Sequence, residues 1–269
     1  METSLRRRLD TELVRRGIAG GRDEAKRLIG GGSVAVDGST MVKPSTLVAE
    51  SAAITLITEQ SQWASRGALK LAHALTYFDL DLAGVRALDV GASTGGFTDV
   101  LLAQGAATVT AVDVGYGQMV WRLSQDPRVN VVDRTNFRTI DPASLGDPFD
   151  IIVVDVSFIS VGLLTSQLAA VGTDVADYVV LVKPQFEVGK DKVGRGGIVV
   201  DPVWHAEAIR TVAGALDQHG LGTVGLTTSP ITGSKGNREF LVHARGGSTP
   251  AVDDAAIERE VARRPPRRR

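Results

Sequence analysis

The chain contains no cysteine, so disulfide bonds, thiol catalysis and cysteine-ligated zinc are excluded. Its four histidines lack ligand spacing, and we expect no metal site. Long apolar runs are also missing. No stretch approaches the roughly 18 uninterrupted apolar residues of a membrane span, and the N-terminus lacks the apolar core of a signal peptide. We therefore expect a soluble, cytoplasmic protein that makes no contact with membranes.

A strong excess of one charge is missing as well, since the formal net charge is −1. The charges are unevenly distributed, however. Residues 1–30 hold eight bases against five acids, and residues 263–269 include five arginines. Contact with phosphate depends on such local clusters rather than on net charge. The N-terminal cluster is thus a candidate for nucleic-acid contact, and the basic end is either a second contact or a solvated tail.

A glycine-rich turn, Leu88 to Phe97, lies between a predicted strand and a predicted helix. Backbone N–H groups at such a helix N-terminus can approach a ligand closely. Phe97 stands where a phosphate-binding P-loop needs lysine, and Ser93 breaks the glycine pattern of a dinucleotide site. The remaining pattern, Asp-x-Gly-x-x-x-Gly-Gly, is typical of the S-adenosylmethionine (SAM) turn of class I methyltransferases. The alternative is a turn that only packs the helix on the strand.

From Val85 onward the pattern alternates between strands and helices, which predicts a Rossmann-like α/β fold around a parallel sheet. Ligands of such sheets bind at the carboxyl ends of the strands. Asp113 ends the second strand about 20 residues after the turn, where a ribose contact belongs. We expect strands near 86–90, 107–113, 129–133, 150–155, 178–183, 222–228 and 239–243, and helices near 97–104, 116–124, 160–170 and 203–218.

The N-terminal part predicts a small α+β unit. Apolar spacing predicts a helix that begins at Leu5 and is stopped by Gly17, and a second one over 22–29. Strands are expected near 33–38, 42–48 and 53–57. This pattern resembles the S4-type RNA-binding domain. The resemblance implies RNA-backbone contacts by Arg6, Arg15, Arg16, Arg22, Lys26 and Arg27. A solvated helical hairpin whose arginines bind nothing is the alternative.

These observations divide the chain into four parts. We expect an S4-type domain over 1–58, a polar linker over 59–64, a methyltransferase domain over 65–247 and a basic, mobile tail over 248–269. Segment 189–197 is rich in glycine and basic residues. It predicts a mobile loop over the site, either as an RNA clamp or as a plain connection.

Four ionisable residues, in the order Lys70, Asp155, Lys183 and Glu239, are similar to the Lys-Asp-Lys-Glu tetrad of FtsJ-type 2′-O-ribose methyltransferases. Asp155 and Lys183 end apolar strands, where an ionised group needs a partner. The phrases Ser-Arg-Gly-Ala-x-Lys-Leu, Asp-Val-Gly-Tyr-Gly-Gln, Asp-x-Ser-Phe-Ile-Ser and Val-Lys-Pro-Gln-Phe-Glu-Val-Gly add to this likeness. From about Leu5 to Ala244, the chain resembles the TlyA family of ribosomal RNA methyltransferases.

The resemblance implies SAM-dependent methylation of cytidine 2′-hydroxyls in 16S or 23S ribosomal RNA, on a flipped-out nucleotide. Lys183 is then the general base or an oxygen-orienting cation, Asp155 and Glu239 are positioners, and Lys70 is a second charge. Two structural salt bridges are the alternative. The implied SAM contacts are Asp89, Gly91, Ser93, Gly95, Asp113, Asn136 and Asp155.

Three further points stay open at this stage. Phe158 and Phe186 follow strand ends and either stack on a base or pack in the core. The whole chain is alternatively a non-catalytic RNA-binding protein of ribosome assembly. A membrane-acting haemolysin is the least favoured alternative, because the sequence lacks a spanning segment.

Overall fold

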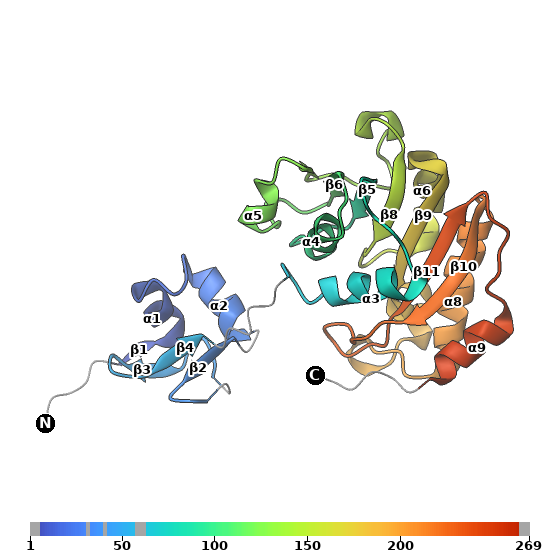
Figure 1. The fold of residues 1–269 in the computed structure, drawn as a ribbon. Helices are drawn as coiled ribbons and strands as arrows, with labels where there is room; N and C mark the ends of the chain where they lie inside the picture. Colours follow the sequence, from blue (N-terminus) through green and yellow to red (C-terminus); the bar gives the residue numbers. More distant parts are fainter. Residues whose placement is uncertain (1–5, 31–32, 40–41, 57–62, 264–269) are drawn as a thin grey trace, which may run out of the picture. The chain divides into compact units, whose positions relative to one another are not determined.

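The computed structural model describes residues 6–30, 33–39, 42–56 and 63–263. The chain forms two compact units, residues 1–62 and 63–269, and each is described by itself (Figure 1). Leu5 of the predicted first helix, residues 59–62 of the predicted linker and residues 264–269 of the predicted tail lie outside the described residues. Within the described ranges, no helix combines the length and the apolar character needed to cross a bilayer.

The described residues of the N-terminal unit form two helices and two short antiparallel strand pairs. Helices α1 (Leu9–Arg15) and α2 (Arg22–Gly30) enclose a core that includes Leu9, Leu13, Ala25, Ile29, Val34 and Val48. Strand β1 (Arg6–Arg8) pairs with β3 (Leu47–Ala49), and β2 (Val34–Val36) pairs with β4 (Ile54–Leu56).

Two predictions for this unit were wrong in detail. Residues 6–8 form a strand rather than the start of the first helix, because their backbone pairs with β3 and the apolar helical spacing begins only at Leu9. The strand expected over 42–48 is confined to Leu47–Ala49. Both differences arise from strand pairing between segments about 40 residues apart in sequence, which local apolar spacing does not report.

The C-terminal unit is built on a seven-stranded sheet with the order β10-β11-β9-β8-β5-β6-β7, which confirms the predicted Rossmann-like α/β fold. Neighbouring strands pair in parallel from β9 to β7, whereas β11 is antiparallel to both β9 and β10. The strands are β5 (Arg86–Val90), β6 (Thr108–Val112), β7 (Val129–Val132), β8 (Phe149–Val154), β9 (Gly172–Val182), β10 (Leu221–Thr228) and β11 (Phe240–Gly246).

Helices cover both faces of this sheet (Figure 1). Along β9, Val179 and Leu181 join a core with α3 (Ala68–Phe78) and α4 (Gly96–Ala103), while Val180 and Val182 join a core with α6 (Thr165–Val171) and α8 (Pro202–Asp217). This alternation is the period of two expected for a strand buried on both faces. Short helices α5 (Trp121–Ser124) and α7 (Pro184–Glu187) lie at the connections.

The helix expected over 116–124 is reduced to α5. Its predicted first half is a loop, because backbone N–H groups there bond to carboxylates instead of forming a helical turn. Gly115 N–H donates to Asp113 Oδ1 over 2.6 Å, and Gly117 N–H donates to Asp133 Oδ2 over 2.7 Å. Positive φ at Gly117 also interrupts a right-handed helix.

The prediction of a mobile tail from 248 onward was wrong for helix α9 (Asp254–Ala262). Asp253 caps this helix by accepting a hydrogen bond from Ala256 N–H over 2.7 Å. Ile257 and Val261, one turn apart, are buried in the core that contains α8. Two apolar residues one turn apart are weak evidence for a helix in the sequence. The helix is stabilised only where the rest of the fold offers an apolar surface for them to pack against.

Segment 189–197 is held by specific contacts rather than standing free. It forms two 3₁₀ turns, Lys190–Lys192 and Arg195–Gly197. Lys192 Nζ lies 2.5 Å from Glu207 Oε1, and Asn237 Nδ2 donates to the carbonyl of Gly197 over 2.7 Å. These bonds anchor the segment at two points, and its mobility stays a prediction.

Candidate active site

Four ionisable side chains from four separate segments line one cavity of about 570 Å³. They are the predicted tetrad residues Lys70 on α3, Asp155 after β8, Lys183 after β9 and Glu239 before β11. Lys183 Nζ lies 2.5 Å from Asp155 Oδ1, and Lys70 Nζ lies 2.6 Å from Glu239 Oε2. The structure therefore brings together four charges from positions as far apart in the chain as 70 and 239.

The sheet topology explains this convergence. Strands β8 and β9 are parallel neighbours, with Val154 opposite Val180, so Asp155 and Lys183 both follow carboxyl ends at the same sheet edge. Strand β11 runs antiparallel beside β9, with Phe240 opposite Val182, which places Glu239 at that edge too. Only an antiparallel last strand brings its first residue, rather than its last, to the site.

Burial makes the pairing of these charges necessary. Lys70 and Lys183 are each 8% exposed, and Glu239 is 3% exposed. Burying a charge without a partner costs on the order of several kcal/mol. The positive charge of each lysine must therefore be compensated by its paired carboxylate. Lys183 Nζ also donates to Ser157 Oγ over 2.8 Å. A substrate hydroxyl entering this cavity would thus meet ammonium groups that are already oriented.

The glycine turn leaves room for close backbone approach. Gly91 has φ +88°, and a Cβ at this position would lie 2.6 Å from the carbonyl oxygen of Asp155. Any side chain there would displace the Asp155 backbone. Gly91 and Ser93 line both this cavity and an adjoining cavity of about 480 Å³.

The adjoining cavity combines several polar side chains with an apolar wall. Asp113 and Asn136 line it, together with apolar residues that include Val112, Phe137, Ile159 and Leu164. Asp113 Oδ2 accepts a hydrogen bond from Ser93 N–H over 2.8 Å, which fixes the carboxylate beside the turn. Asn136 Oδ1 accepts from Arg138 N–H over 3.1 Å. Asp155 lines both cavities and therefore marks their junction.

Two residues with predicted cofactor contacts, Asp89 and Gly95, do not line either cavity. Asp89 is fully buried, and its Oδ2 accepts hydrogen bonds from the N–H and the hydroxyl of Thr98 over 2.9 and 2.7 Å. At Gly95, with φ +92°, a Cβ would lie 2.5 Å from Leu123 Cδ1. Both residues shape the turn and the start of α4, and direct contact of either with a cofactor stays a prediction.

Burial raises the pKa of Asp89 to about 7, although the hydrogen bonds from Thr98 act in the opposite direction. The native state then holds a proton that the unfolded chain releases near its ordinary pKa of 3.8. Stability from this group is present below about pH 4 and is lost as pH rises toward 7, by roughly 4 kcal/mol.

We expect Asp89→Asn to remove this decline, because the amide oxygen still accepts from Thr98 but carries no charge at any pH. Denaturant unfolding of both proteins at several values between pH 4 and 8 measures the effect. The free energy of unfolding of the variant relative to wild type should rise across this range. Parallel curves for the two proteins would contradict the assignment.

Sequence reasoning missed some residues of the cavity. Ser157 accepts a hydrogen bond from Lys183. Its position two residues after Asp155 was the feature of the sequence that could have indicated this role. Gly233 lies so close to the Glu239 carboxylate that any side chain there would displace that group. Phe158, 89% exposed and with φ +67°, lies at the junction of both cavities, with its ring centroid 5.2 Å from that of Phe186. Its exposure argues against the core alternative for Phe158.

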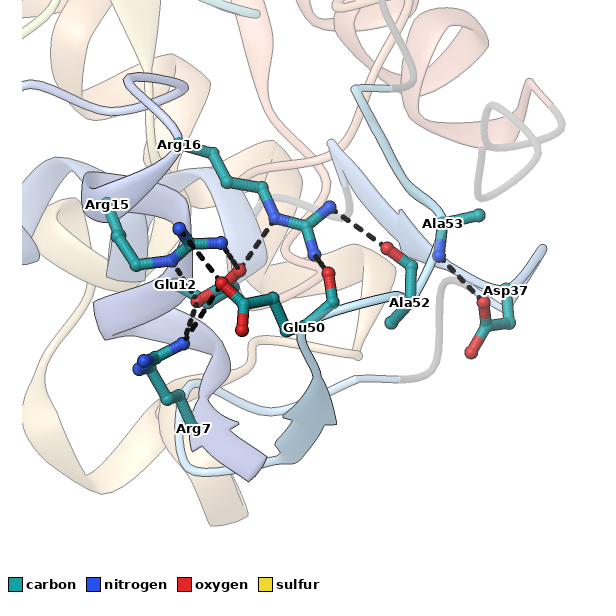
Figure 2. A network of polar contacts seen from close by, with 8 residues as sticks. All are labelled: Arg7, Glu12, Arg15, Arg16, Asp37, Glu50, Ala52 and Ala53. Carbon is teal, nitrogen blue, oxygen red and sulfur yellow. Dashed lines mark hydrogen bonds and ion pairs between the residues drawn. The ribbon is translucent and has the colours of Figure 1, made fainter. Parts of the chain in front are cut away.

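The predicted RNA-binding arginines of the N-terminal unit fall into two groups. Arg16 is structural: it donates to Glu12, to the carbonyl of Ala52 over 2.9 Å and to the carbonyl of Glu50 over 2.7 Å (Figure 2). Arg15 donates twice to the Glu12 carboxylate and remains partly exposed. The Arg16 guanidinium therefore joins α1 to the β3–β4 connection, and its RNA contact stays a prediction.

The remaining basic residues are more accessible. Arg22 lies 3.5 Å from Asp10, and Lys26 lies 3.2 Å from Asp23. Arg6 and Arg27 are exposed, and within the described residues neither forms an ion pair. Arg8 also projects an exposed guanidinium from buried Asp10. These side chains, rather than Arg16, are available to a ligand.

Comparison with known proteins agrees with this geometry. Residues 63–246 match the FtsJ-like methyltransferase family. A Mycobacterium tuberculosis protein named 16S/23S rRNA (cytidine-2'-O)-methyltransferase TlyA is 47% identical over 259 residues, which are 96% of this chain and 97% of that protein. Hemolysin A of Brachyspira hyodysenteriae is 34% identical over 88% of this chain and 98% of its own length.

A solved structure shows the same relationship in three dimensions. This protein, from Streptococcus thermophilus and provisionally named a hemolysin, is 38% identical, with a TM-score of 0.76 over 97% of this chain and 96% of its own. The identity and the coverage together are high enough to assign the family. With its FtsJ-like methyltransferase domain, the chain belongs to the TlyA family of ribosomal RNA methyltransferases.

Proposed function

We propose that this protein transfers a methyl group from SAM to the 2′-hydroxyl of a cytidine in 16S or 23S ribosomal RNA. The observation that carries the proposal is the pair of lysine–carboxylate contacts in one cavity, of which Asp155 also lines the adjoining cavity. The proposed target is the one named for the Mycobacterium tuberculosis relative, which covers nearly the whole chain. A ribosomal substrate also implies work in the cytoplasm, on ribosomal subunits or their precursors.

The residues of the two cavities fit SAM. The apolar wall of the smaller cavity suits the adenine ring, Asp113 can accept from the ribose hydroxyls, and Asn136 offers a polar contact to the adenine edge. Gly91, Ser93 and Asp155 would hold the methionine end, because they line both cavities. When bound, SAM supplies an electrophilic methyl group on a sulfonium.

Lys183 takes the central chemical role in this proposal. A ribose hydroxyl is a weak nucleophile near neutral pH and needs a base within hydrogen-bond reach. Acting as the base, Lys183 would accept the hydroxyl proton on its nitrogen while the oxygen gains the methyl group and the sulfonium sulfur of SAM keeps the electron pair of the broken bond. Ser157 fixes the amine, and the Lys70–Glu239 pair orients the same oxygen or a neighbouring phosphate.

The exposed ring of Phe158 suits a flipped-out base at the cavity mouth. The N-terminal unit would hold the RNA backbone through its accessible basic residues, in line with its resemblance to an S4-type domain. The relative named Hemolysin A does not alter the proposal, because the described part of this chain has no helix suited to span a membrane.

Mapping of 2′-O-methyl groups tests the function directly. Ribosomal RNA from cells with and without the protein should differ at one or more cytidines, and purified protein with SAM should restore the difference. Calorimetry with SAM separates the runner-up, a non-catalytic assembly protein, which would bind RNA but not SAM. Unchanged methylation in the absence of the protein would contradict the proposal.

The accessible arginines predict a defined salt dependence of RNA binding. We expect the double variant Arg6→Ala/Arg27→Ala to bind ribosomal RNA more weakly and to lower the slope of log affinity against log salt by about 1 to 2. Arg259→Ala, which removes an exposed arginine from α9, is the matched control and should leave the slope unchanged. Equal slopes for wild type and the double variant would show that these two arginines make no phosphate contact.

A further inference from the structure

We propose that Arg238 is a positioning residue, which uses the C-terminal helix α9 to hold Glu239 beside Lys70. The inference rests on the proposed methyltransferase function. It concerns a helix that contributes no residue to either cavity among those the structure describes. Figure 1 shows α9 packed beside β10 and α8, at the end of the described chain.

Arg238 caps the C-terminal end of α9. Its Nη1 donates to the carbonyl of Val261 over 2.5 Å, and its Nη2 donates to the carbonyl of Glu260 over 2.8 Å. The last carbonyls of a helix lack partners within the helix and carry partial negative charge, so a guanidinium is well suited to bind them. Arg238 is only 9% exposed and lies with its Cζ 4.9 Å from the Phe240 ring centroid.

A second set of bonds returns from α9 to Glu239. Glu260 Oε1 accepts from the N–H and the hydroxyl of Thr228, over 2.7 and 2.8 Å. Thr228 Oγ1 in turn accepts from Arg238 Nη2 over 2.9 Å. The next residue, Ser229, donates its N–H to the carbonyl of Glu239 over 2.9 Å. The backbone of Glu239 is therefore enclosed in a closed set of bonds that passes through α9.

Asn237, the residue before Arg238, is also held by hydrogen bonds. Asn237 is buried, and its side chain bonds to Val199 N–H over 2.9 Å and to the carbonyl of Gly197 over 2.7 Å. Glu239 itself has a long side chain whose position depends on where its backbone is held. Loosening Arg238 would free one side of this backbone, and a displacement of about 1 Å in a reacting site can reduce the rate about 100-fold.

The test compares Arg238→Met and Arg238→Lys with Arg210→Ala. Arg210 also binds α9, with its Nε 2.5 Å from Asp254 Oδ1, but at the other end of that helix. We expect Arg238→Met to lower kcat on ribosomal RNA about 10- to 100-fold, with an unchanged Kd for SAM by calorimetry. Arg238→Lys should recover part of the loss, because an ammonium can bind one carbonyl. Arg210→Ala should keep the wild-type kcat, even where its unfolding temperature falls equally.

A double variant shows whether the effect passes through Glu239. In a Glu239→Gln background, Arg238→Met should reduce the residual kcat by much less than it does alone. If the Arg238 variants do not fold, Thr228→Val tests the proposal instead, because it removes only the hydroxyl that joins Arg238 to Glu260. This variant should lower kcat. Wild-type kcat in the folded variants, or fully multiplicative losses, would overturn the proposal. Absence of methyl transfer by the wild-type protein would instead overturn the proposed function.

Discussion

Replacing Lys183 by methionine is expected to reduce methyl transfer about 1,000-fold while SAM still binds. The side chain has nearly the same length and apolar stem, so the cavity keeps its shape but loses the nitrogen 2.5 Å from Asp155. The hydroxyl then loses the amine proposed as its base. Single-turnover transfer of a labelled methyl group to ribosomal RNA measures the rate, and calorimetry measures the Kd for SAM.

Lys183→Arg separates the two possible roles of this lysine. A guanidinium keeps the positive charge and orients oxygen, but it does not release its proton in proteins. If Lys183 is the base, Lys183→Arg should be as slow as Lys183→Met. Arg128→Met, which removes a cation paired with Asp126 outside both cavities, is the control and should react at the wild-type rate. Substantial activity in Lys183→Arg would reassign the residue as an orienting cation.

Replacing Glu12 by alanine is expected to open the N-terminal unit. Glu12 is 1% exposed and binds Arg15 and Arg16, and Arg16 continues to the carbonyls of Glu50 and Ala52 (Figure 2). Loss of this carboxylate should cost about 2 to 3 kcal/mol. A unit of this size has a total stability of about 3 to 9 kcal/mol, so the loss is a large part of it.

Hydrogen exchange in the full-length protein reads out this unit separately. Amides of α1 and α2 should exchange faster in Glu12→Ala, while those of the seven-stranded sheet keep their protection. Glu50→Ala is the matched control, because this carboxylate is 55% exposed and exposed pairs contribute little. Equal acceleration by both variants would contradict the role given to Glu12.

Acid should have the same effect as the substitution. Hydrogen bonds from Arg15 lower the pKa of Glu12 to about 2, against burial, which raises it. Since the native pKa lies below the ordinary value of 4.5, this stabilisation is present above pH 4.5 and is lost as pH falls toward 2. In Glu12→Gln, protection of α1 should depend less on pH across this range.

Much of the catalytic unit was predictable from local sequence. The alternation of strands and helices, the glycine turn and the charges after apolar strands each depend on residues close together in the chain. Asp155 and Lys183 stood out for this reason, since an ionised group rarely ends a buried strand without a partner. The distinction between Gly91, which lines the cavities, and Asp89, which supports them, was not predictable, because it depends on which atoms of Thr98 and Asp155 lie nearby.

The arginines of the N-terminal unit show most clearly what could not be predicted from local sequence. By sequence, Arg6 and Arg16 are equivalent basic residues of a predicted helix. In the structure, Arg6 lies on a strand and is exposed, whereas Arg16 reaches carbonyls more than 30 residues further along the chain. No local pattern distinguishes a solvated guanidinium from one that donates hydrogen bonds to backbone carbonyls distant in the sequence.

By itself, then, the sequence determined the two-part organisation, the sheet and the kind of chemistry, because apolar periodicity and charge placement act over a few residues. Tertiary structure alone decided how Lys70 pairs with Glu239, which arginines stay accessible, and that residues 254–262 form a helix bound by Arg238. Each of these depends on contacts between segments distant in sequence. Such contacts form only when burial of both partners outweighs the entropy of ordering the chain between them.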